Sequence, residues 1–219
     1  MIEARDLYDY SDIRGLKEAT MWVAHAERPT LVLGGSQSVD VLNSSSLTST
    51  DLRRRRGGGG LVLLRPKDIW VDWWIPTGDS RWAYDVHASS RGAGNWWAEA
   101  LRDVAEGEIS VHHGSLSGEL AFRLVCFAGR GPGEVFVDGR KAVGLTQWRV
   151  REGVFLSTVL PREKTSDVVK YLVAAPEGLA EALDAHTLSS LSVDDASALV
   201  DRLASLSGPW VRRDIFLTD

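Results

Sequence analysis

The stretch EVFVDGRKAVGLTQWR, residues 134–149, contains the clearest folding signal in the sequence. Residues 134–137 alternate as in a strand, and the pair Asp138-Gly139 is typical of a tight hairpin turn. A return strand then begins at Lys141 and runs toward Trp148. Residues 154–160 are rich in strand formers and would add a third strand. The sequence therefore predicts a three-stranded meander in this part of the chain.

Strands and helices are mixed along the rest of the chain. Further strands are predicted at residues 30–33, 61–64, 69–75, 109–112 and 122–127. Helices are predicted at residues 16–26, 85–105, 166–173, 178–183 and 193–206. Because the strands group as hairpins, with helices before, between and after them, the pattern predicts an α+β or mixed α/β fold without regular βαβ alternation. Trp70 and Trp74 alternate with Trp73, which indicates that both faces of their strand are covered.

Composition and charge limit the classes of protein that fit. The chain has 219 residues, of which 44% are hydrophobic and 25% charged, so it can bury a substantial core. Its net charge of −5 disfavours a general nucleic-acid-binding surface. The N-terminus is acidic without the apolar core of a signal peptide, and no apolar run approaches the roughly 20 residues that cross a bilayer. We therefore expect a cytoplasmic protein that binds neither nucleic acid nor membrane.

The segment RRRRGGGG, residues 53–60, combines a basic run with four glycines. It could be a ligand-binding loop, because glycines allow close backbone approach and arginines bind phosphate or carboxylate. It could equally be a flexible, solvated turn. Strand alternation predicts that Arg53 and Arg55 lie on one side and Arg54 and Arg56 on the other, so only one pair can face a cleft. A phosphate-binding P-loop is disfavoured because no Gly-Lys-Ser/Thr follows.

Single residues of chemical interest each allow two interpretations. Lys141 directly follows a rigid turn and could aim its charge at a reacting group, or it could be an exposed hairpin lysine. Cys126, the only cysteine, could be an activated nucleophile or a small buried residue at the end of the strand predicted at 122–127. Being alone, it excludes an internal disulfide and suits a reducing cytosol. His112-His113 has no third ligand at suitable spacing, so no metal site is predicted.

Three blocks of sequence together resemble a known family. They are LVLGGSQSVDVLN at 31–43, RRRRGGGGLVLL at 53–64 and VDGRKAVGLTQWR at 137–149. In this order they resemble the blocks of the lipoate–protein ligase and octanoyltransferase catalytic domain, which biotin–protein ligases share more distantly. The third block is the most specific, because its turn, lysine, glycine and glutamine are all in register. The resemblance covers roughly residues 30–172.

The resemblance implies a fold and a set of site residues. The fold would be a mixed, mostly antiparallel sheet flanked by helices, with 1–219 as a single catalytic domain, a core at about 30–172 and a C-terminal helical segment at about 173–219. The glycine loop would shape an acyl tunnel, and Lys141 would contact the acyl carboxylate, thioester carbonyl or adenylate. The matching substrate- and ATP-binding residues are Arg54, Arg55, Gly58, Gly59, Gly60, Gly139, Gly144 and Gln147. We expect residues 58–60 to line a cleft facing Lys141, with the strands beside both motifs in one sheet.

The resemblance also implies a reaction. A ligase would use ATP and Mg²⁺ to activate a lipoyl- or octanoyl-type acid and would transfer it to a lysine of a carrier domain. That acceptor would be a lipoyl domain or a carrier protein of the glycine-cleavage type.

Two alternatives remain open. In cysteine-dependent octanoyltransferases the nucleophile lies about fifteen residues before the motif lysine and precedes a phenylalanine. Cys126 lies fifteen residues before Lys141, Phe127 follows it, and Glu134 resembles a family glutamate. An acyl carrier protein would then be the acyl donor. The other alternative is a non-catalytic module that binds a small acid or a partner, because the loop departs from the family pattern. These departures are Gly57 for serine, Leu61 for alanine and Leu64 for histidine.

Overall fold

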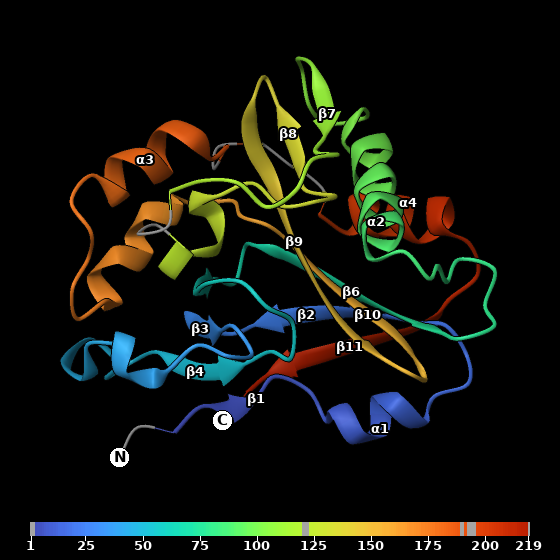
Figure 1. The fold of residues 1–219 in the computed structure, drawn as a ribbon, viewed down its shortest axis with the longest axis horizontal. Helices are drawn as coiled ribbons and strands as arrows, with labels where there is room; N and C mark the ends of the chain where they lie inside the picture. The colour runs from blue at the N-terminus through green and yellow to red at the C-terminus, as the bar shows by residue number, and fades with distance from the viewer. Residues whose placement is uncertain (1–2, 120–122, 189–190, 192–195, 219) are drawn as a thin grey trace.

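The computed structural model describes residues 3–119, 123–188, 191 and 196–218, whose strands form two sheets (Figure 1). The larger sheet has the strand order β11-β2-β6-β10-β9-β8-β7, and the smaller has the order β1-β4-β3-β5. The larger contains β2 (Thr20–Ala26), β6 (Ile69–Pro76), β7 (Ile109–Val111), β8 (Val135–Val137), β9 (Arg140–Val150), β10 (Gly153–Leu160) and β11 (Val211–Leu217). The smaller contains β1 (Arg5–Asp6), β3 (Thr30–Leu33), β4 (Asp51–Arg54) and β5 (Val62–Leu64). Since only β11 and β2 run parallel in the larger sheet, the predicted mixed, mostly antiparallel fold is confirmed.

Helices flank the larger sheet. The α-helices are α1 (Tyr10–Gly15), α2 (Val86–Leu101), α3 (Leu179–His186) and α4 (Ala196–Ser207). Short 3-10 helices are η1 (Val39–Val41), η2 (Ser44–Ser46), η4 (Cys126–Ala128) and η5 (Thr165–Tyr171). Helices α2 and α4 pack against each other on one face of the larger sheet, and the smaller sheet packs on its opposite face. None of these described helices is both long and apolar enough to cross a membrane.

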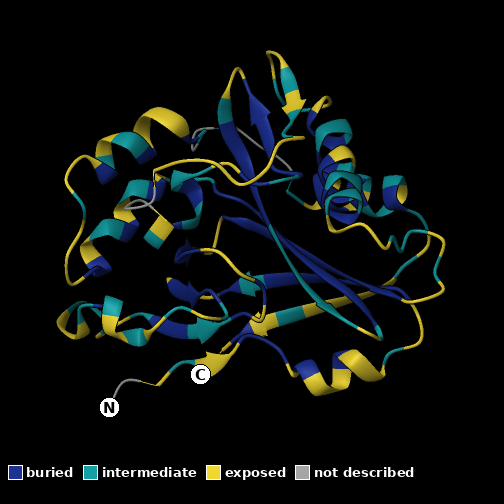
Figure 2. Cartoon of the chain, in the orientation of Figure 1, coloured by how far each residue is buried: buried dark blue, intermediate teal, exposed yellow. Residues whose placement is uncertain are grey.

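The central strands of the larger sheet are buried on both faces, as Figure 2 shows. Trp70 and Trp74 point into the core shared with the smaller sheet, whereas Trp73 points into the core beneath α2 and α4. The alternation predicted from the tryptophans is therefore confirmed. Trp97 of α2 extends the second core and donates a 2.8 Å hydrogen bond to the Thr158 hydroxyl of β10. Tryptophan thus supplies much of the apolar area in both cores.

The helix predicted at residues 16–26 is wrong, because this segment forms strand β2. Met21 and Val23 face the core beneath the helices, whereas Trp22 and Ala24 face the other core. A strand buried on both faces has a nearly continuous apolar sequence, which lacks the alternation that separates strand from helix.

The strand predicted at residues 122–127 is also wrong in its described part. Only Val125 forms a bridge, to Leu61, and the chain then enters η4 at Cys126. This turn directs Phe127 into the core, where its ring packs on Gly144. Residue 122 lies outside the described residues.

The last part of the chain differs from the prediction in one respect. The residue ranges of η5, α3 and α4 agree with the three predicted helices to within a few residues, and η5 is of the 3-10 type. Residues 193–195 lie outside the described part of the chain. The segment also contains β11, which the sequence analysis did not predict. This strand pairs in parallel with β2 over residues 211–217 and adds an edge to the larger sheet.

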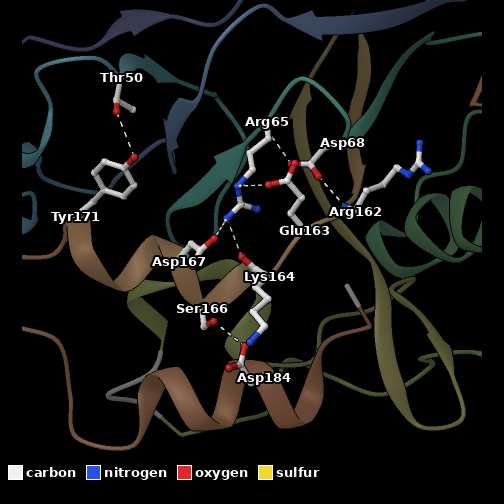
Figure 3. A network of polar contacts seen from close by, with 10 residues as sticks. All are labelled: Thr50, Arg65, Asp68, Arg162, Glu163, Lys164, Ser166, Asp167, Tyr171 and Asp184. Atoms are coloured by element: carbon white, nitrogen blue, oxygen red, sulfur yellow. Dashed lines mark hydrogen bonds and ion pairs between the residues drawn. The ribbon is translucent and has the colours of Figure 1, made fainter. Parts of the chain in front are cut away.

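A polar network ties the end of β5 to the segment that follows β10 (Figure 3). The Arg65 guanidinium donates to the Asp167 carboxylate at 2.8 Å and to the Lys164 carbonyl at 2.7 Å. The Asp68 carboxylate accepts from the backbone N–H groups of Arg65 and Arg162. Burial raises the pKa of Asp68 to about 6. The network therefore fixes the smaller sheet against η5.

Asp72 of β6 lies buried in the core and should make stability depend on pH. Its carboxylate accepts a 2.7 Å hydrogen bond from the Trp70 indole, and burial raises its pKa to about 7. Between about pH 4 and 7 the folded chain retains a proton that the unfolded chain releases, so the free energy of unfolding falls by a few kcal/mol as pH rises. Asp72→Asn retains the acceptor for Trp70 but carries no charge. Its melting temperature should exceed that of the parent at pH 8, and the difference should vanish near pH 4.

The exposed Asp103→Asn is the control, and it should melt like the parent at both pH values. A melting difference for Asp72→Asn that stays constant between pH 4 and pH 8 would contradict the assignment.

Candidate active site

A cavity of about 450 Å³ opens between the glycine loop and strand β9. Residues 58–60 line one side, and residues 145–147 of β9 line another. The Thr146 hydroxyl donates to the Gly58 carbonyl at 3.0 Å, so the loop contacts the larger sheet beside the cavity. The lining is mostly apolar. Five of the expected site residues contribute to it: Gly58, Gly59, Gly60, Cys126 and Gln147.

The buried guanidinium of Arg55 holds the glycine loop in shape. It donates to the carbonyls of Gly58 at 2.9 Å, Gly60 at 2.7 Å and Val32 of β3 at 3.1 Å. Gly59 has φ of +87°, a left-handed conformation that glycine adopts without steric cost. The loop is therefore fixed from behind by an arginine, while its glycines face the cavity.

The other three arginines of the run also contact the chain itself. Arg54 donates to carbonyl oxygens of the turn at 34–37, the shortest bond being 2.6 Å. Arg53 and Arg56 each pair with an aspartate of the smaller sheet. None of the four side chains lines the cavity between the loop and β9. Contact of Arg54 and Arg55 with substrate or ATP stays a prediction.

The expected division of this run into two alternating pairs is wrong. Strand β4 ends at Arg54, so the alternation stops before Arg55. The expectation that the strands beside both motifs share one sheet is wrong as well. Strands β4 and β5 beside the glycine loop belong to the smaller sheet, whereas β8 and β9 beside Lys141 belong to the larger. The two motifs meet because the sheets pack face to face.

Lys141 is buried behind the cavity wall. Its ammonium group donates to the Cys126 carbonyl at 3.0 Å and the Gly129 carbonyl at 2.7 Å, and it pairs with the Glu134 carboxylate at 2.7 Å. Its side chain lines a second, smaller cavity of about 250 Å³ rather than the one beside the glycine loop. The interpretation of Lys141 as an exposed hairpin lysine is therefore wrong.

Glu134 is a site residue that the sequence analysis did not select. It lies immediately before β8, pairs with Lys141 across the hairpin, and accepts a 2.6 Å hydrogen bond from the Gly131 N–H. Unlike Lys141, it lines the cavity beside the glycine loop. Burial raises its pKa above the usual range, although the Lys141 ammonium acts in the opposite direction. Three strand residues separate Glu134 from the hairpin turn, and in the sequence only its resemblance to a family glutamate pointed to it.

Cys126 and Gln147 line the same cavity from different elements. Cys126 begins η4 and is half-buried, and its sulfur lies close to Gly59. The Gln147 amide donates to the Ser90 hydroxyl of α2 at 2.8 Å. Its carbonyl oxygen is buried without a partner among the described residues, so it is free to accept a hydrogen bond.

The remaining two expected site glycines have roles in the backbone. Gly139 has φ of +74° in the turn between β8 and β9 and lines neither of the two cavities. A Cβ at Gly144 would lie 3.0 Å from the Phe127 ring, so the absence of a side chain allows η4 to approach β9.

Arg123 is the second site residue that the sequence analysis missed. It lines the cavity beside the glycine loop, is exposed, and is the only lysine or arginine among the described lining residues. Its side chain has no hydrogen bond or ion pair within the described part of the chain. A cation in such a position can bind an anionic group. Nothing in the local sequence pattern distinguishes it from other surface arginines.

The described residues contain no group of three or more histidine, cysteine, aspartate or glutamate side chains that could hold a metal ion.

Comparison with known proteins supports the fold. No family model matches the chain, and no curated protein matches it by sequence. Among solved structures, lipoate-protein ligase A bound with ATP aligns over 100% of this chain and 90% of that protein, at 14% identity and a TM-score of 0.70. A putative lipoate protein ligase of T. acidophilum with bound lipoic acid gives the same coverages and identity and a TM-score of 0.66.

A third structure contains a bi-partite lipoate protein ligase of Thermoplasma acidophilum and its E2 lipoyl domain. It aligns over 100% of this chain and 89% of that protein, at 14% identity and a TM-score of 0.68. The chain therefore has the fold of the lipoate–protein ligases, as its three sequence blocks predicted.

Proposed function

We propose that this protein is an enzyme of the lipoate–protein ligase type. It would activate a lipoyl- or octanoyl-type acid with ATP and transfer the acyl group to a lysine of a carrier domain. The observation that carries this proposal is the mostly apolar cavity between the glycine loop and β9, with the Lys141–Glu134 pair beside it. Its volume of about 450 Å³ lies within the range of ~300–1,000 Å³ of small-molecule sites.

The ligands of the solved neighbours support the choice of substrates. Structures with this fold are described with ATP, with lipoic acid and with a lipoyl domain. We therefore infer a lipoyl carrier domain, or a carrier protein of the glycine-cleavage type, as the acceptor. Magnesium would bind as a complex with ATP, because the phosphates usually provide much of its coordination. We also propose residues 1–219 as one catalytic domain acting in the cytoplasm.

The residues around the cavity would have different roles in binding and catalysis. The glycine loop would form the wall of the acyl site, where the missing side chains leave room for the chain of the acid. Lys141 would hold the acyl carboxylate and stabilise the negative charge that grows during acyl transfer. The unpartnered Gln147 oxygen would accept from a donor on the bound substrate.

A thermal-shift experiment tests the proposal directly. Melting temperatures are measured with ATP and Mg²⁺, with lipoate, octanoate or biotin, and with each acid plus ATP. A ligase should be stabilised by octanoate or lipoate together with ATP beyond either alone, because only the folded state binds them. No shift with any of the acids would contradict the proposal.

Arg123 should contribute to binding of the acid. Replacing it with alanine removes the only cation among the described lining residues, so octanoate should bind about tenfold more weakly by calorimetry. The matched control is Arg151→Ala, because Arg151 is 95% exposed and is not among the lining residues. Equal affinities for Arg123→Ala and Arg151→Ala would exclude Arg123 as a ligand-binding residue.

A cysteine-dependent transferase is the second candidate, favoured by one observation. Cys126 lines the cavity, and its carbonyl accepts a hydrogen bond from Lys141. In this route the Cys126 thiolate would attack the thioester of an acyl carrier protein, form an acyl-enzyme and release the carrier thiol. Lys141 would polarise the thioester carbonyl.

Cys126→Ser separates the two routes. In the ligase route the acyl adenylate reacts directly with the acceptor lysine, so ATP-dependent acylation should stay within about twofold of the parent. Acceptor modification is followed by intact mass, and iodoacetamide labelling at neutral pH reports on the thiol. Loss of activity in Cys126→Ser, together with an acyl adduct on the parent enzyme, would show that the transferase route operates instead.

A further inference from the structure

The ammonium group of Lys141 has no free donor in this structure. A lysine ammonium has three N–H bonds, and Lys141 directs them at three acceptors, namely two main-chain carbonyls and the Glu134 carboxylate. The group is also almost completely buried. A substrate carboxylate can therefore gain a hydrogen bond from Lys141 only if one of these acceptors gives way.

The residues that supply the three acceptors of Lys141, namely Cys126, Gly129 and Glu134, all line the cavity beside the glycine loop. Only the acceptor of Glu134 belongs to a side chain. Its carboxylate pairs with Lys141 at 2.7 Å, yet Glu134 lines the cavity beside the glycine loop and Lys141 does not. The two carbonyls belong to η4 and the turn after it, so their removal would require the backbone to move. A side chain can reorient at much lower cost.

The charges close to Glu134 determine whether its carboxyl group is ionised or protonated when an acid substrate binds. An anionic substrate that approaches Lys141 through this cavity meets the Glu134 carboxylate first, and two carboxylates that share one site cannot both stay ionised. Lys141 is the charged group in contact with Glu134, while Cys126 and Arg123 are the other titratable groups that line the cavity. Burial already favours the neutral form of Glu134 by raising its pKa.

We infer that Glu134 is a positioning residue that is exchanged for the acid substrate as the partner of Lys141. The Glu134–Lys141 ion pair breaks, the substrate carboxylate pairs with the ammonium group, and Glu134 takes up one proton from solvent. The inference rests on the proposed function, because it requires a substrate with a free carboxylate.

Isothermal titration calorimetry with octanoate measures the number of protons that the protein takes up on binding. Titrations of the full chain in phosphate and in Tris at pH 7.5 should give different heats, because the buffer that supplies the proton contributes its own ionisation enthalpy. The difference should correspond to one proton taken up for each octanoate bound. By linkage, the Kd should also rise with pH, by at most about tenfold per pH unit, over the range in which this proton is taken up.

Glu134→Gln provides the matched variant. Its amide oxygen can still accept from the Gly131 N–H, but it cannot take up the proton. Octanoate should bind with the same heat in both buffers, with a Kd that does not change from pH 7 to 9, and at least tenfold more tightly than to the parent at pH 8. Glu99→Gln, an exposed substitution on α2, should behave like the parent.

The outcomes separate the two proposals. Octanoate binding to the parent without proton uptake would overturn the role of Glu134 and leave the proposed function intact. Absence of octanoate and lipoate binding in both the parent and Glu134→Gln would overturn the acid site itself, and with it both proposals. The proton count of the parent decides the question even if Glu134→Gln does not fold.

Discussion

Replacing Lys141 with alanine should reduce acylation of the carrier domain by at least about a hundredfold. In either chemical route, negative charge develops on an acyl oxygen or on its leaving group, and a fixed cation that stabilises this charge lowers the barrier by a few kcal/mol. No other lysine in the described chain lines either of the two cavities. The rate of acceptor modification, followed by intact mass, measures the effect.

The control is Lys67→Ala, because Lys67 is exposed in a turn between β5 and β6. It should retain full activity. Lys141→Ala also leaves Glu134 without its partner, so thermal unfolding must show that the variant is folded at the assay temperature. Full activity of a folded Lys141→Ala variant would contradict both the ligase and the transferase route.

Replacing Arg55 with alanine should greatly reduce the free energy of unfolding. The substitution removes the donor from the carbonyls of Gly58, Gly60 and Val32, and buried acceptors without donors are costly. We expect a loss of about 3 kcal/mol or more in the free energy of unfolding, equivalent to a decrease on the order of 10 °C in melting temperature. Octanoate binding should weaken in parallel, because the same bonds hold the glycine loop against the cavity.

Arg56→Ala is the control next to it in the sequence. Arg56 is half-exposed, and its ion pair with Asp6 lies on the surface. Surface pairs contribute at most about 1 kcal/mol, so this variant should melt within a few degrees of the parent. Equal destabilisation by the two substitutions would show that Arg55 does not hold the loop.

The hairpin of β8 and β9 was predictable because its signal is local. Asp138 and Gly139 both adopt positive φ in the turn, and few residue pairs tolerate this conformation. The glycine run predicted a loop for the same reason, although its residues alone left a ligand-binding loop and a solvated turn equally open. By contrast, β2 was mistaken for a helix because its burial on both faces depends on two cores that form only in the folded chain. Strand β11 was missed because it is an exposed, charged edge strand whose partner β2 lies far away in the sequence.

The candidate site was only partly predictable, because five of the ten expected residues line the cavity beside the glycine loop. Spacing and resemblance selected Cys126 and the glycine loop, and the structure places them on one cavity. The arginine run was harder to interpret, because the acceptors of Arg54 and Arg55 are main-chain carbonyls, which side-chain patterns do not reveal. Lys141 and Glu134 lie across one local hairpin, but the strand register shifts between Val135 and Phe136, so simple alternation did not predict their pairing.

We propose that this chain activates a free acid and transfers it to a carrier lysine. The most direct measurement is the intact mass of an apo lipoyl domain after incubation with the enzyme, ATP, Mg²⁺ and octanoate or lipoate. We predict that the carrier gains the mass of the acyl group less one water, on a lysine, and only when ATP is present. An unchanged carrier mass with both acids, or acylation from an octanoyl carrier-protein thioester without ATP, would contradict the claim.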